Sequence, residues 1–130
     1  MTVGLSRNNP WNLMPGIAWD GSTVVDDGPL QFETPLLGMR AGIKNCYTQQ
    51  SEGNNTPLKF VTKYAPPPNP TAQYLQNVCD WTGFEMSQTL DFHEETTMIT
   101  WAKAVFRQEQ GVDNGITTEE IQAGIVAANE

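Results

Sequence analysis

One carboxylate in this chain lies where an amphipathic helix gives way to a loop. Residues 98–110 have apolar side chains at helical spacing, and Gly111 follows as a stop signal, which places Glu109 in the last turn. The negative end of the helix dipole and burial against aromatic side chains both disfavour a charged carboxylate. Such an acid stays protonated near neutral pH and can serve as a general acid. The alternative is a surface glutamate paired with Lys103 or Arg107.

A cluster of asparagines near the start of the chain is a second candidate site. Asn8, Asn9 and Asn12 lie in a run that contains the turn signals Asn-Pro and Pro-Gly, so irregular structure held by Trp11 is expected over residues 1–16. Asparagine side chains in such loops commonly bond to the backbone. Amides beside an aromatic face also suit sugar hydroxyls and pyranose rings, so sugar recognition is the functional alternative.

The elements that must position these residues form a mainly α (α+β) pattern with a small antiparallel β-lobe near the N-terminus. Turn signals at Asp20-Gly21 and Asp27-Gly28 predict two or three short strands within residues 17–33. Capping and proline signals then predict helices beginning after Thr34, Thr56, Asn69, Asp91 and Thr117. No repeat or dividing linker is present, so a single domain over residues 1–130 is expected.

Composition argues against several partners. The net charge is −8 with only seven Lys and Arg, so nucleic acid is not expected to bind. No window approaches ~18 apolar residues, and the N-terminus lacks an apolar core, so neither a membrane nor a secretory signal is expected. One histidine and no C-x-x-C predict no metal or cofactor, and Cys46 and Cys79 fall on apolar helix faces as buried thiols.

An ordered set of motifs resembles a family of phage and prophage virion proteins. The set covers roughly residues 6 to 125. Its members are Arg7-Asn8-Asn9-Pro10-Trp11-Asn12-Leu13, Trp19-Asp20-Gly21, Phe32-Glu33-Thr34-Pro35, Gly38-Met39-Arg40-Ala41, Tyr64-Ala65-Pro66-Pro67 with Asn69, Thr71 and Tyr74, and Glu109-Gln110-Gly111.

The same chain is similar to flagellar-type glucosaminidases of the lysozyme superfamily. Residues 8–74 resemble the part of those enzymes that follows their catalytic glutamate helix, and the helix ending at Glu109 resembles that helix itself. The resemblance implies a lysozyme-like domain that is circularly permuted, with Glu109 catalytic. The residues implied to bind substrate are Asn8, Asn9, Asn12, Trp19, Tyr64 and Asn69.

Two departures from the family pattern lead to specific expectations. Trp11 stands where the family has glycine, so either the turn differs or the Trp side chain points outward. Pro68 stands where the family has a glutamate before Asn69. Tyr64 and Tyr74 are both candidates to orient a sugar, although core packing is the main expectation for Tyr74. Hydrolysis would need a second carboxylate, for which the β-lobe offers Asp20, Asp26, Asp27 and Glu33.

The resemblance implies a phage-derived glycosidase that degrades peptidoglycan. Muramidase, glucosaminidase and lytic transglycosylase chemistry all remain open. The alternative is a non-enzymatic virion or tail protein, structural or glycan-binding, with a lysozyme-like fold, which the negative charge favours because cell walls are anionic. The implied partners are peptidoglycan glycan strands and other virion proteins. The implied location is the virion or the host cytoplasm before release.

Overall fold

Two helices begin at threonine–proline signals. In the computed structural model, which describes residues 1–130, Thr34 and Thr56 cap α2 (Pro35–Ser51) and α3 (Pro57–Tyr64). Each threonine hydroxyl accepts a hydrogen bond from a backbone N–H of the first turn, and proline occupies the first helical position. Both predicted helices are confirmed. The sequence was enough to locate them because a cap and a first-turn proline act only on neighbouring residues.

The later helices follow the predicted order, with one difference at a start. α4 (Thr71–Thr82) ends at Gly83, which adopts the left-handed conformation. α6 (Thr118–Ala128) has the predicted capping box of Thr117 and Glu120. α5 (Glu95–Gln110) is capped by Glu94. The prediction that Asp91 caps this helix was wrong: its carboxylate instead accepts from the backbone of His93, within a turn before the helix.

The N-terminal lobe contains less sheet and more helix than the sequence indicated. A short helix, α1 (Val3–Ser6), replaces part of the expected irregular segment. The sheet consists of β1 (Ser22–Thr23) and β2 (Gln31–Phe32), which pair antiparallel with Ser22 opposite Phe32. The apolar runs around residues 17 and 24 do not form strands; Ile17, Val24 and Val25 are exposed, and Trp19 is half-buried against the core.

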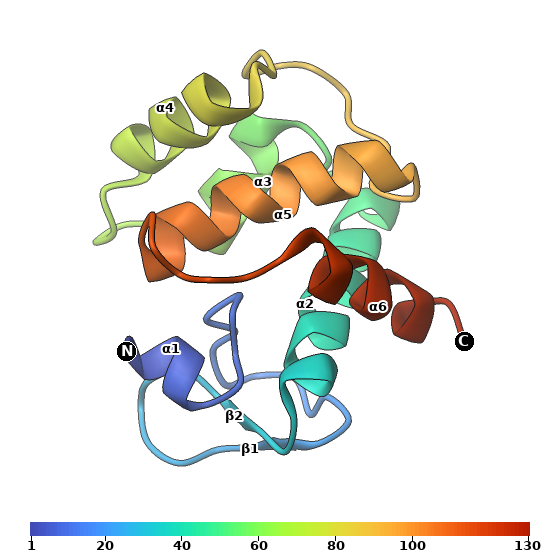
Figure 1. The fold of residues 1–130 in the computed structure, drawn as a ribbon. Helices are drawn as coiled ribbons and strands as arrows, with labels where there is room; N and C mark the ends of the chain where they lie inside the picture. The colour runs from blue at the N-terminus through green and yellow to red at the C-terminus, as the bar shows by residue number, and fades with distance from the viewer.

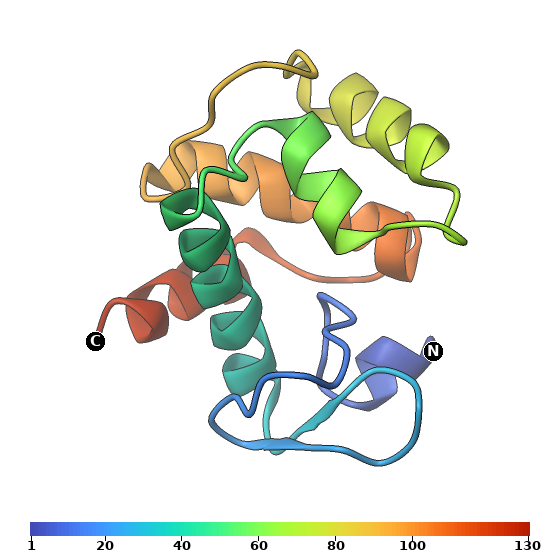
Figure 2. The same cartoon turned by 180° about the vertical axis from the view of Figure 1, so that it is seen from behind.

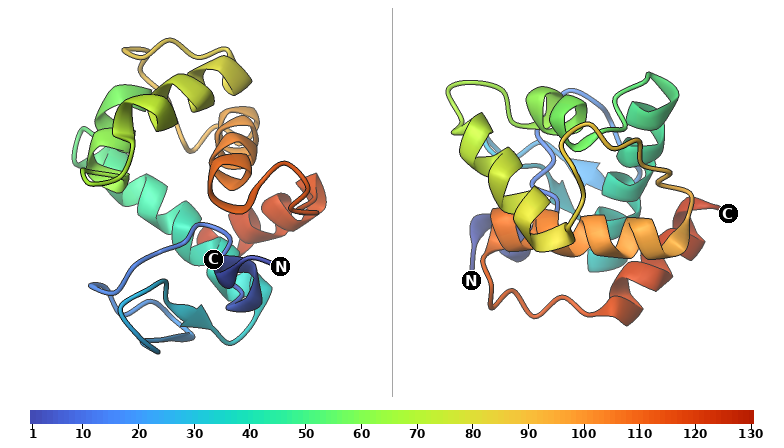
Figure 3. Two further views of the ribbon diagram at one scale, coloured as in Figure 1. Left: turned by 90° about the vertical axis from the view of Figure 1, so that its left-hand side faces the viewer. Right: turned by 90° about the horizontal axis from the view of Figure 1, so that it is seen from above.

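The helices and the N-terminal lobe form two regions joined by α2. Figures 1 and 2 show residues 1–33 gathered on one side, with α3, α4 and α5 on the other. α2 runs between these regions and packs against α6, while α4 packs against both α3 and α5. The views in Figure 3 also place α4 alongside α5. A mainly helical protein with a small antiparallel sheet, as predicted, is confirmed.

One hydrophobic core runs through both regions, and Trp11 lies inside it. The indole is fully buried, packs edge-on against Phe106 with ring centroids 4.7 Å apart, and donates from Nε1 to the Met39 carbonyl at 3.2 Å. A Cβ at Gly42 would overlap this indole, so α2 needs a glycine there. The outward orientation considered for Trp11 was therefore wrong, and the turn that follows it has the left-handed Asn12, φ +53°.

Both cysteines are free thiols. Cys46 is buried and Cys79 half-buried, and burial raises the pKa of each. No helix combines the length and apolar character that a membrane crossing requires. No group of three or more His, Cys, Asp or Glu side chains is placed to hold a metal ion.

Candidate active site

An open cleft of about 660 Å³ lies between the N-terminal lobe and the helices. Its walls come from residues 12–17, Trp19 and Pro29 of the N-terminal lobe, from α2, α3 and the loop that follows α3, and from one end each of α4 and α5. The volume falls within the range of sites that bind small ligands. Glu109, in the last turn of α5, is part of the wall.

Both carboxylate oxygens of Glu109 accept hydrogen bonds from the protein. The Asn12 amide donates from Nδ2 to Oε1 at 2.8 Å, and the Tyr74 hydroxyl donates to Oε2 at 2.9 Å. These donors come from the turn after α1 and from α4, so three separate segments meet at one acid. The carboxylate is half-buried, and none of the ion pairs in the structure includes it.

Burial raises the pKa of Glu109 above its usual value. The bonds from Asn12 and Tyr74 stabilise the charged form and act in the opposite direction, but burial is the larger effect. The alternative of a surface glutamate paired with a neighbouring cation does not describe this geometry. Arg107 instead lies over the ring of Trp81, 4.3 Å from its centroid, and Lys103 is exposed.

Four of the predicted substrate-binding residues line the same cleft as Glu109. They are Asn12, Trp19, Tyr64 and Asn69. Tyr64 donates from its hydroxyl to the Trp11 carbonyl, and burial raises the pKa of the phenol well above its usual value. Asn69 bonds to the Pro66 carbonyl at 2.8 Å. The fold thus brings together amide and aromatic side chains that are separated in the sequence by α2 and α3.

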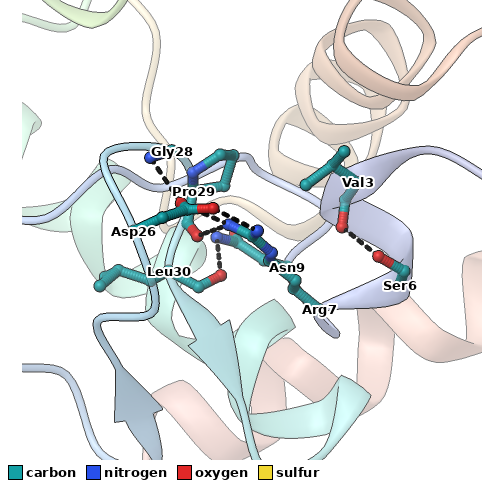
Figure 4. A network of polar contacts seen from close by, with 8 residues as sticks. All are labelled: Val3, Ser6, Arg7, Asn9, Asp26, Gly28, Pro29 and Leu30. Atoms are coloured by element: carbon teal, nitrogen blue, oxygen red, sulfur yellow. Dashed lines mark hydrogen bonds and ion pairs between the residues drawn. The ribbon is translucent and has the colours of Figure 1, made fainter.

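Asn8 and Asn9 do not line the cleft. Asn8 donates to the Phe32 carbonyl at 3.0 Å, and the fully buried Asn9 donates to the carbonyls of Leu13 and Leu30. Figure 4 shows the Asn9 contact with Leu30 beside the ion pair of Arg7. These amides satisfy buried backbone carbonyls of the N-terminal lobe, as the backbone-bonding alternative for the cluster implies.

No second carboxylate lines the cleft with Glu109. Asp26 forms a two-pronged pair with Arg7 at 2.8 and 3.0 Å (Figure 4), and this bond lowers the pKa of Asp26 to about 2. Asp20 pairs with Arg40 at 3.5 Å. Asp27 and Glu33 also lie outside the cleft wall. Glu109 is therefore the one acid, and Lys63 the one cation, of the lining.

Sequence reasoning missed two residues next to the acid. Tyr74 was expected in the core, and it is buried, but its hydroxyl reaches Glu109. Gln110, only 6% exposed, contacts the turn that carries Asn12. A tyrosine on an apolar helix face and a glutamine at a helix end are common features, so neither residue type signals such a contact before the chain is folded.

Comparisons with known proteins do not assign a family or an activity to the chain, so the candidate site is argued from its geometry alone. No family model matches the chain, and no curated protein matches it significantly. The resemblance to phage virion proteins and glucosaminidases accordingly stays a prediction. The site itself offers one acid with a raised pKa, set among amides and aromatic rings in an open cleft.

Replacing Tyr74 with phenylalanine is expected to raise the pKa of Glu109 further. The hydroxyl stabilises the carboxylate, so its removal leaves the charged form less favourable. Carbon-13 NMR of the glutamate carboxyl during a pH titration measures the shift. Tyr47→Phe is the matched control, since the Tyr47 hydroxyl contacts Asn129 on the far end of α6 and should leave the titration unchanged. An unaltered midpoint in Tyr74→Phe would contradict the assignment.

Proposed function

We propose that this protein cleaves the glycan strands of peptidoglycan, with Glu109 as the general acid. The observation that carries the proposal is a half-buried glutamate with a raised pKa on the wall of an open cleft. The catalytic acid of lysozyme is likewise a glutamate that an apolar setting keeps protonated near neutral pH. Amide side chains such as Asn45 and Gln49 and the ring of Trp19 offer hydrogen bonds and a stacking face to sugars.

The single carboxylate favours the lytic transglycosylase reaction among the glycosidase routes. Glu109 gives its proton to the glycosidic oxygen as the bond from that oxygen to C1 breaks, and positive charge develops on the sugar ring. The sugar's own 6-hydroxyl then attacks C1 and returns its proton to Glu109, which closes a 1,6-anhydro ring. Neither water nor a second carboxylate takes part, in accord with a cleft lined by one acid.

The contact between the end of α5 and the turn after α1 supports our proposal of a permuted lysozyme-like arrangement, and with it the same function. The end of α5, which carries the acid, lies against the turn after α1: Gln110 donates to the Pro10 carbonyl at 2.9 Å, and Thr2 donates to Gln110. In a lysozyme-like enzyme of the unpermuted order, the glutamate helix would lead directly into that turn. Phage origin, and action on the bacterial wall from the virion or after release, belong to this proposal.

The second candidate is a non-enzymatic virion protein that binds glycan through the same cleft. The net charge of −8 favours it, because long-range repulsion slows approach to an anionic wall. In that case the amides and Trp19 would bind sugar, and Glu109 would accept a hydrogen bond from a sugar hydroxyl without transferring a proton.

Digestion of purified sacculi tests the proposed function. The expected soluble products are muropeptides ending in 1,6-anhydro sugars, identified by mass spectrometry. Products with reducing ends would instead indicate hydrolysis by water. Protein that co-sediments with sacculi but releases nothing would contradict the enzyme and support the binding protein.

A further inference from the structure

A buried glutamine, Gln110, lies behind the cleft and contacts the Asn12 amide on the side away from Glu109. We propose that Gln110 is a positioning residue, which holds Asn12 with its NH2 group toward Glu109. The inference rests on the proposed function, in which Glu109 is the reacting acid. Gln110 itself does not line the cleft and would not touch the substrate.

The contacts of Gln110 use both ends of its amide. Nε2 donates to the Pro10 carbonyl at 2.9 Å and to Asn12 Oδ1 at 3.1 Å, with a longer contact of 3.4 Å to the Asn9 carbonyl. Oε1 accepts from the Thr2 hydroxyl. The side chain is therefore fully engaged, and it joins the end of α5 to both α1 and the turn that follows α1.

These contacts fix the orientation of the Gln110 amide first and, through it, that of the Asn12 amide. Backbone carbonyls only accept, so the NH2 group of Gln110 must face Pro10 and Asn9. The oxygen of Asn12 must then face Gln110, because turning the Asn12 amide round would set two NH2 groups against each other. With its oxygen committed, Asn12 presents Nδ2 to Glu109, where it bonds to Oε1 at 2.8 Å.

The chain packs closely around this pair of amides. A Cβ at Gly4 would overlap Asn12 Oδ1 and would lie 2.9 Å from the Asn9 carbonyl oxygen, so α1 approaches closely only because residue 4 is glycine. Asn12 also adopts the left-handed conformation at φ +53°, which asparagine tolerates better than most residues. The left-handed backbone of Asn12, the absence of a Cβ at Gly4 and the hydrogen bonds of the two amides are all compatible with this arrangement.

The consequence is control over the protonation of Glu109. The other groups that face it are Tyr74 on α4 and Tyr64 on α3, with Cys46 on α2 behind them, and burial keeps all three neutral by raising their pKa values. Lys63 lines the cleft but pairs with Glu52 at 3.7 Å. Donation from Asn12 thus opposes the effect of burial, and Gln110 keeps that donor in place.

A double-mutant titration tests the proposal on the full chain. Gln110→Met removes the amide, frees Asn12 to turn, and is expected to raise the Glu109 pKa by about one pH unit, measured by carbon-13 NMR of the carboxyl. In the Asn12→Ala background, where the pKa is already raised, Gln110→Met is expected to add no further shift. Gln76→Met is the control, because Gln76 on α4 bonds to Asp80 and is not part of the cleft lining. In sacculus digestion, the falling limb of the pH profile should move to higher pH in Gln110→Met.

Two results would overturn the positioning role: an unchanged midpoint in Gln110→Met, or an equal shift with and without Asn12. Should Gln110→Met fail to fold, the wild-type protein answers the question. The Asn12 side-chain nitrogen resonance must then titrate with the Glu109 midpoint, and the Gln110 amide protons must exchange slowly; failure of either overturns the proposal.

The titration also separates this inference from the proposed function, since it needs no substrate. Intact coupling in a protein that cleaves no glycan would disprove the function alone. Absent coupling in a protein that cleaves glycan would disprove the role of Gln110 alone.

Discussion

Replacement of Glu109 with glutamine is expected to abolish glycan cleavage while leaving the fold intact. Glutamine has nearly the same shape and can still bond to Asn12 and Tyr74, but it has no proton to give to the leaving oxygen. Loss of a general acid costs about 10²- to 10⁴-fold in rate. Release of soluble muropeptides from sacculi, followed over time at equal protein concentration, measures the loss.

The same substitution should not lower stability at neutral pH. A carboxyl whose pKa is raised by folding binds its proton more tightly in the native state, so the native state is favoured while the group is protonated. That advantage declines as the pH rises from the unfolded pKa to the folded pKa, where the carboxyl ionises in its buried position. Glutamine does not ionise, so it avoids the cost of burying a charge. The melting temperature of Glu109→Gln at pH 7 should therefore equal or exceed that of the wild type.

A matched control separates the loss of the acid from the loss of a negative charge. Glu119→Gln makes the same chemical change at an exposed position in the first turn of α6, and Glu119 is not part of the cleft lining. Its rate of muropeptide release should match that of the wild type. Equal release by Glu109→Gln and wild type would show that Glu109 is not the acid.

Local signals in the sequence were enough to locate α2, α3 and α6. Thr34, Thr56 and Thr117 each cap a helix within a few residues of themselves, so no distant contact decides them. The start of α5 was misplaced because Asp91 and Glu94 are both acidic and three residues apart. Both accept from backbone N–H groups, and only the path of the chain determines which one begins the helix.

Of the residues that line the candidate site, the sequence indicated Glu109, two of the amides and two of the aromatic rings; the amides are Asn12 and Asn69, and the rings are Trp19 and Tyr64. Glu109 was visible because helical periodicity ends at a glycine. The three asparagines share a residue type, and only the folded chain shows that Asn12 faces the acid while Asn9 bonds to buried carbonyls. The Tyr74 bond to Glu109 spans 35 residues of sequence, a separation at which spacing carries no information.

Trp11 should also be the largest single contributor to stability near the site. Trp11→Ala is expected to lower the free energy of unfolding by about 3–5 kcal/mol, because it leaves a large cavity beside Phe106 and removes the hydrogen bond from the indole to the Met39 carbonyl. For a chain of this size, the melting temperature should fall by roughly 10–20 °C. Chemical denaturation followed by circular dichroism provides the free energy.

Trp81 supplies the comparison that assigns this loss to burial. The two tryptophans differ in exposure, 0% for Trp11 and 37% for Trp81, and the guanidinium of Arg107 lies over the ring of Trp81. A stacked cation at an exposed ring contributes about 0.5–1 kcal/mol, so Trp81→Ala should cost far less than Trp11→Ala. Similar losses for the two variants would mean that Trp11 does not anchor the turn, and the support for Asn12 would then have to come from Gln110 and Gly4 alone.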